Sequence, residues 1–159
     1  MPTSFAGTGW PRFPYEALRH ARQGDFQLVL CPFIVDEARS HIAELLPNAL
    51  TNFEEFLRIA KYEEVPTPSK QQVRIHVDLV RDPADVPVAL AAINAAVDCL
   101  VSEDKDLTAQ DETTAKLRQE LKVYLSGTFL REMMGWTSEE LEVIRKRSWS
   151  DLAPPFSQG

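Results

Sequence analysis

DPADVPVALAAINAAVDCLVSEDKDL, residues 82–107, is the stretch that decides the fold. Its first half opens on acidic residues and is then rich in alanine and valine, which predicts a helix over 84–96 that packs closely on a sheet. The short apolar run 99–102 has the length of a buried strand, and more acids follow it directly. A helix that leads into a buried strand is typical of an α/β fold with a parallel sheet.

The same alternation of strand and helix signals continues along the chain. Strands are expected at 26–30, 62–65 and 123–125, and helices at 11–24, 32–46, 50–60, 111–121, 129–134 and from Thr137 onward. Residues 71–80 are ambiguous, because Val73, Ile75, Val77 and Leu79 alternate as in a strand although the region could be partly helical. We therefore expect one three-layer α/β/α domain over 1–150 with a mainly parallel central sheet, followed by a flexible tail over 151–159.

Composition favours an ordinary globular domain with its own core. Of 159 residues, 44% are apolar and 26% charged, and no apolar run approaches the roughly 20 residues of a membrane span. The first ten residues lack the features of a secretory signal, so we expect a cytoplasmic protein that does not enter a membrane. Cys31 and Cys99 each lie in an apolar run, which predicts two buried thiols.

The net charge of −7 is the wrong sign for binding nucleic acid through overall charge. An acidic metal site would contribute to that charge, and a bound cation would screen it. Any RNA contact would therefore depend on local basic patches.

Four acids are candidates for a metal site. Glu37 follows the expected strand 26–30, Asp85 opens the helix 84–96, and Asp104 and Asp106 follow the strand 99–102. In a parallel sheet these positions share one rim, where a divalent cation relieves the repulsion between carboxylates and can activate a water. Taken singly, each acid also has an ordinary role, as a helix N-terminal residue for Asp85 and as a turn or surface residue for the others.

Four segments together resemble the PIN-domain family over roughly residues 11–134. They are LVLCPFIVDEARSHI (28–42), RDPADVPVALAAI (81–93), DCLVSEDKDL (98–107) and YLSGTFLREM (124–133). The resemblance implies that Glu37, Asp85 and Asp104 are catalytic metal-binding acids, with Asp106 as a further ligand and Ser102 in place of a threonine. It also implies a metal-dependent endoribonuclease that uses Mg²⁺ or Mn²⁺ to hydrolyse RNA, often as the toxin paired with an antitoxin protein.

The chain departs from the family pattern at its beginning. The resemblance implies a first apolar strand that ends in an aspartate, but Asp25 lies in the turn before the expected strand 26–30, which is the wrong place. Either the reading frame was started too late or the element has been lost. In the second case the alternative is a catalytically impaired PIN-like binding or regulatory module, and strand edges left exposed could pair in a homodimer. A phosphoryl-transfer or signal-receiver domain is a third candidate, although the chain lacks the strand-to-aspartate phosphoacceptor of such proteins.

Overall fold

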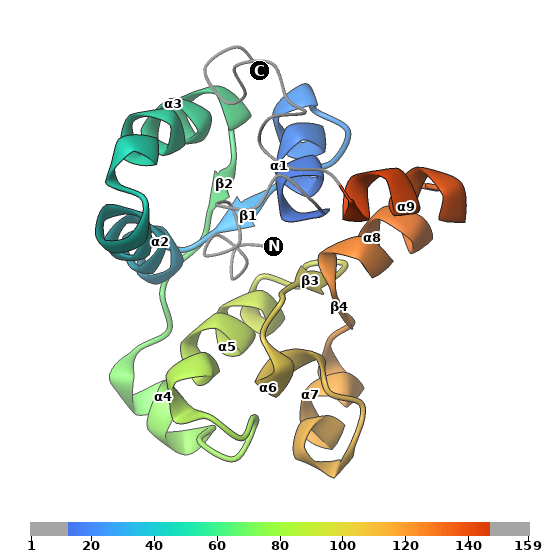
Figure 1. Cartoon of the computed structure of the whole chain (residues 1–159). Helices are drawn as coiled ribbons and strands as arrows, with labels where there is room; N and C mark the ends of the chain where they lie inside the picture. The colour runs from blue at the N-terminus through green and yellow to red at the C-terminus, as the bar shows by residue number, and fades with distance from the viewer. Residues whose placement is uncertain (1–12, 147–159) are drawn as a thin grey trace.

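The structure is a computed structural model, and it describes residues 13–146. Within these residues, helices surround four short strands (Figure 1). The strands are β1 (Val29–Leu30), β2 (Glu63–Glu64), β3 (Leu100–Val101) and β4 (Val123–Tyr124). The α-helices are α1 (Phe13–Gln23), α2 (Pro32–Leu45), α3 (Leu50–Ala60), α4 (Lys70–Ile75), α5 (Val86–Asn94), α6 (Lys105–Thr108), α7 (Ala115–Glu120), α8 (Ser126–Glu132) and α9 (Ser138–Arg145). Three 3₁₀ turns, η2 (Pro47–Ala49), η3 (Pro83–Asp85) and η4 (Glu112–Thr114), lead into α3, α5 and α7.

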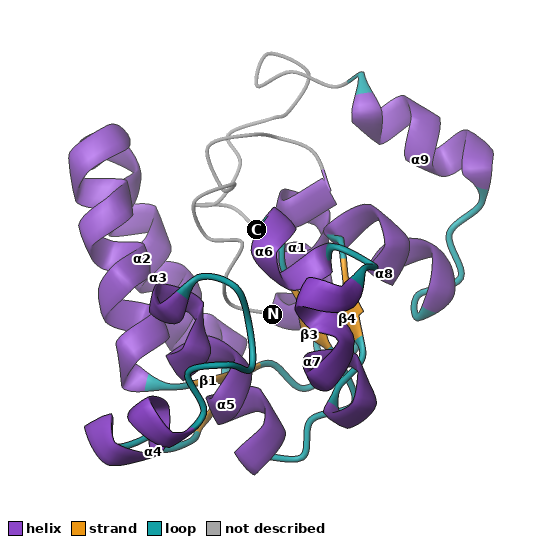
Figure 2. Cartoon of the chain, turned by 90° about the horizontal axis from the view of Figure 1, so that it is seen from below, coloured by secondary structure: helices purple, strands orange, loops and turns teal. Residues whose placement is uncertain are grey.

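The strands form two parallel pairs. Val29 of β1 lies opposite Glu63 of β2, and Leu100 of β3 lies opposite Val123 of β4. Helices connect the strands within each pair, as parallel pairing requires, so the predicted α/β class is confirmed. The pairs do not join into one continuous sheet in the described part of the chain, because β1 and β3 are not hydrogen-bonded to each other. Figures 1 and 2 show β1 apart from β3 and β4 in both views.

Two apolar clusters form the core of the described residues. The larger one joins β1, α2, α3 and α5, and the smaller one joins β3, α8 and α9. Phe26 packs against both clusters, and its ring meets that of Phe129 edge to face, with the ring centres 5.0 Å apart. Phe26 therefore links the parts of the molecule that carry the two strand pairs.

Helix α1 makes a second link between these parts. It contacts α3 on one side and α8 and α9 on the other (Figure 1). Near its C-terminus, His20 Nδ1 lies 2.6 Å from Asp25 Oδ2, and Trp136 Nε1 donates to His20 Nε2 at 3.2 Å. These hydrogen bonds hold the end of α1 against the loop that precedes α9.

Several local predictions have a clear outcome. The helix predicted from Thr137 begins there as α9, with Thr137 and Glu140 forming a capping box. The ambiguous segment 71–80 is not a strand: α4 begins after Ser69, whose side chain forms a capping box with Gln72. Both cysteines are buried, as predicted. The predicted tail 151–159 lies outside the described residues.

Candidate metal centre

The loop after β3 places two of the predicted acids. Ser102 is fully buried, and its hydroxyl accepts a hydrogen bond from the Asp104 N–H at 3.0 Å. Asp104 is the N-cap of α6, and its carboxylate accepts from the Asp106 N–H at 2.8 Å. Thr108 donates to the Asp104 carbonyl at 2.9 Å. The backbone that carries both carboxylates is therefore fixed by local hydrogen bonds.

The turn η3 supplies two more carboxylates from the start of α5. Asp82 caps η3 by accepting a hydrogen bond from the Ala84 N–H at 3.0 Å. Asp85 occupies the N-cap position of α5, but its side chain caps no backbone group. Its carboxylate is therefore not used by its own helix and is turned toward the other acids.

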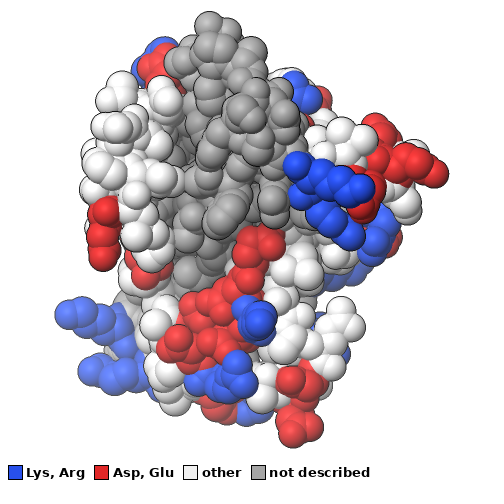
Figure 3. All heavy atoms as spheres, in the orientation of Figure 1, with Lys and Arg blue, Asp and Glu red and all other residues white. Residues whose placement is uncertain are grey.

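Three carboxylates converge closely enough to share a cation. One oxygen from each of Asp82, Asp85 and Asp106 lies within 4.8 Å of the other two. Oxygen ligands of this kind suit a hard divalent cation such as Mg²⁺ or Mn²⁺. Figure 3 shows acidic side chains gathered on this side of the molecule, with basic side chains next to them.

Within this acidic cluster of Asp82, Asp85 and Asp106, the charged form of Asp85 is the most destabilised. Its Oδ2 atom is buried and has no hydrogen-bond partner. Burial, followed by the charge of Asp104 and a hydrogen bond with its side chain, raises the pKa of Asp85 to about 7, and the charges of Asp82 and Asp106 add to this. A cation at this point would satisfy the buried oxygen and relieve the repulsion, so these residues fit a divalent metal ion.

Arg81 is a cation already bound to the cluster. Its Nε donates to Asp106 Oδ1 at 2.9 Å, and a terminal guanidinium nitrogen makes a second, shorter contact with the same oxygen. This bond raises the pKa of Arg81. The Arg81 side chain neutralises part of the acidic charge. It is 61% exposed, so it also stays accessible to an anion at the same edge.

The structure brings together some of the predicted acids and not others. Asp85 and Asp106 lie in the group of converging carboxylates, and Asp104 acts on Asp85 through its charge. Glu37 lies outside this group, on the exposed face of α2. Partial burial raises the pKa of Glu37, and nearby His41 offsets this in part. Its role as a ligand stays a prediction.

Asp82 is a member of the group that sequence reasoning did not select. Its signal in the sequence is an aspartate directly before a proline, which is typical of a helix cap. The side chain does cap η3, and it also faces the cluster. The local capping pattern therefore gives no sign that this side chain also lies beside Asp85 and Asp106 in the folded chain.

A family model described as PIN domain matches residues 11–106. The chain belongs to the PIN-domain family. The match covers more than half of the chain and includes Glu37 and the whole acidic cluster. Searches of curated proteins and of solved structures give no match.

Membership gives the acidic cluster a general context. PIN domains are nuclease-like domains that generally bind divalent metals and act on RNA. Among the described residues, Asp82, Asp85 and Asp106 form a group of carboxylates that is suited to such a metal. Among the described residues, no helix is long and apolar enough to cross a membrane.

Proposed function

We propose that this PIN domain is a metal-dependent endoribonuclease that hydrolyses RNA phosphodiesters with Mg²⁺ or Mn²⁺ as its cofactor. The observation that carries the proposal is the Asp85 carboxylate, which has a buried oxygen without a partner among other acids. A carboxylate held in this way is costly in its charged form unless a cation compensates it. The family membership supports the proposal, since PIN domains are nuclease-like in general.

The acids around Asp85 would bind the cation or support those that do. Asp82, Asp85 and Asp106 supply oxygens to the cation, and Asp104 holds the loop and adds negative charge. Glu37 is included as a proposed ligand from α2. When bound, the cation would polarise a phosphoryl oxygen and lower the pKa of a water molecule.

Basic side chains at the same edge would contact the RNA. The exposed guanidinium of Arg81 lies beside the cluster, and its planar donors suit a phosphate. Lys105 is also exposed and lies between Asp104 and Asp106 in the sequence. With a net charge of −7, binding of RNA would rest on such local cations and weaken strongly with salt.

Cleavage of a fluorophore-labelled single-stranded RNA tests this function. We expect cleavage with Mn²⁺, none with EDTA, and a loss of about 100-fold or more in Asp85→Asn and Asp104→Asn. Glu44→Gln is the matched control, because Glu44 is exposed on α2. Cleavage that survives both EDTA and Asp85→Asn would contradict the proposal. A folded chain that binds Mn²⁺ and RNA without cleaving would favour the impaired binding module instead.

We also propose a cytoplasmic role as the toxin of a toxin–antitoxin pair. The support is the family resemblance alone, and the antitoxin would be a separate protein. Induced expression should arrest growth of a bacterial host, and Asp85→Asn should abolish the arrest. Light scattering at several protein concentrations would test whether the chain also forms a homodimer.

A further inference from the structure

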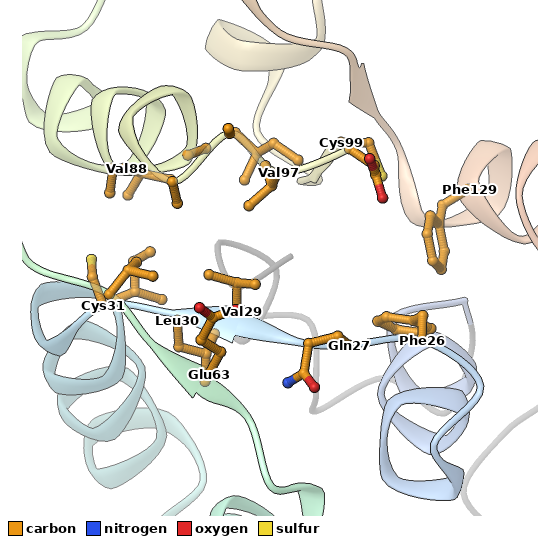
Figure 4. A pocket seen from close by; sticks show the side chains of 18 of the residues that line it. Phe26, Gln27, Val29, Leu30, Cys31, Glu63, Val88, Val97, Cys99 and Phe129 are labelled. Atoms are coloured by element: carbon orange, nitrogen blue, oxygen red, sulfur yellow. The ribbon is translucent and has the colours of Figure 1, made fainter.

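An apolar slot separates the two strand pairs. It has a volume of about 280 Å³ and is lined on one side by Val29, Leu30 and Cys31 and on the other by Val88, Val97 and Cys99. Figure 4 shows β1 running along one wall, with Val88, Val97 and Cys99 on the wall opposite. Domain interiors are normally packed with few voids larger than a water molecule. A slot of this size is therefore suited to an occupant.

One wall of the slot is the edge of a strand. The Leu28 and Leu30 carbonyls accept hydrogen bonds from the N–H groups of Glu63 and Val65, at 2.8 and 2.9 Å, and these bonds face β2. Backbone groups of successive residues in a strand point to opposite edges, so the N–H and C=O of Val29 face away from β2 and toward the slot. An edge of this kind is a template for another strand.

Apolar side chains from several helices line the slot. Ile34 of α2 and Val88 of α5 line one part of it, and Phe129 of α8 lines another. Ala91, Ala92 and Ala95 present small side chains to it, which leaves room for larger ones. An extended segment in contact with these side chains would be rich in aliphatic residues, as buried strands are.

Two acids set the charge of the occupant. Glu63 and Asp98 line the slot and are exposed, and neither forms an ion pair within the part of the chain that the structure describes. The whole chain also carries a net charge of −7. A segment with lysine or arginine beside its aliphatic residues would complement both acids.

We propose that the slot between β1 and β3 binds an extended aliphatic segment of a partner protein, flanked by basic residues, which adds a strand to the edge of β1. The backbone of the segment would pair with the N–H and C=O of Val29, and its aliphatic side chains would fill the slot. The acidic cluster takes no part in this binding. The outcome is therefore independent of whether the chain cleaves RNA.

Fluorescence anisotropy with labelled peptides tests the proposal on the full chain. The first peptide has about five valine and isoleucine residues between paired lysines, and the second has glutamates in place of the lysines. We expect saturable binding of the first, about three- to tenfold tighter than the second. N-methylation of alternate peptide residues, on the edge that faces β1, should weaken binding by about tenfold or more, and methylation of the other edge should weaken it less.

Charge reversal assigns the peptide to this slot. In the double variant Glu63→Lys and Asp98→Lys, the glutamate-flanked peptide should bind more tightly than the lysine-flanked one. The double variant Glu44→Lys and Glu120→Lys, at two exposed acids outside the slot, makes the same change in net charge and should leave the preference as it was. Bound peptide should also slow the reaction of Cys31 and Cys99 with a thiol reagent, because both line the slot.

Three results would overturn the proposal. The first is that neither peptide binds to the folded chain. The second is that N-methylated and unmodified peptides bind equally, since strand addition needs the backbone donors. The third is that the chain self-associates and the lysine-flanked peptide dissociates it, which would make a second copy of the chain the occupant.

Discussion

Replacing Asp85 with asparagine should stabilise the metal-free chain at neutral and alkaline pH. The pKa of Asp85 is raised from 3.8 to about 7, mainly by burial and by the charge of Asp104. The folded chain therefore binds this proton more tightly than the unfolded chain does. The proton on Asp85 therefore stabilises the folded chain. This stabilisation is fully present below about pH 4 and is lost as the pH rises to about 7.

The size of the effect follows from the pKa. Each pKa unit corresponds to about 1.4 kcal/mol, which gives an upper limit of about 4 kcal/mol. The carboxylate is partly exposed and solvent screens it, so we expect about 1–2 kcal/mol. In EDTA, the free energy of unfolding of the unmodified chain should fall between pH 4 and pH 8. In Asp85→Asn it should fall by about 1–2 kcal/mol less over the same range.

Urea unfolding followed by tryptophan fluorescence at both pH values measures this difference. Adding Mg²⁺ or Mn²⁺ at pH 8 should reverse the order of stability, since an ion at 100 times its Kd adds about 2.7 kcal/mol to the chain that binds it. Glu44→Gln should follow the unmodified chain throughout. If the free energy of unfolding has the same pH dependence in the unmodified chain and in Asp85→Asn, and does not respond to the ion, then Asp85 neither has a raised pKa nor binds the metal.

Three further substitutions probe other contacts. Phe26→Ala should lower the free energy of unfolding, measured in urea, by about 2–4 kcal/mol, because the ring packs on both apolar clusters and on Phe129. A loss below about 1 kcal/mol would show that the ring does not link the two clusters. Lys61→Gly should raise the melting temperature by a few degrees, because Lys61 ends α3 with a left-handed φ of 50°, and an unchanged or lower value would argue against that backbone. Arg81→Gln should tighten Mn²⁺ binding about two- to fivefold in calorimetry, because Arg81 competes for Asp106; weaker binding would mean that Arg81 organises the site instead.

Much of the local structure could be predicted because it depends on nearby residues. The apolar spacing of 50–60 gives α3, and a threonine followed by a glutamate three residues later gives the start of α9. Segment 71–80 was ambiguous because short alternating runs also occur in helices. In the structure, the capping box of Ser69 and Gln72 starts helix α4, although the apolar residues alternate as in a strand.

The site and the slot depend on tertiary structure, and this limits what the sequence can show. Asp85 and Asp106 could be selected because the start of a helix and the end of a strand lie at the same rim of a parallel sheet. Asp82 could not, because a capping aspartate has the same local pattern whether or not it faces a cluster. The separation of β1 from β3 was also not predicted, because each strand signal looks the same with or without a neighbour on its second edge.

Calorimetric titration of the metal-free chain with Mn²⁺ tests directly whether the carboxylates around Asp85 form a metal site. We expect saturable binding of one ion that is lost or reduced about tenfold or more in Asp85→Asn, reduced in Asp104→Asn, and unchanged in Glu44→Gln. Circular dichroism on the same samples establishes that each variant is folded. Absence of Mn²⁺ binding in the folded chain, or equal binding by Asp85→Asn, would contradict the claim that these carboxylates form a metal site.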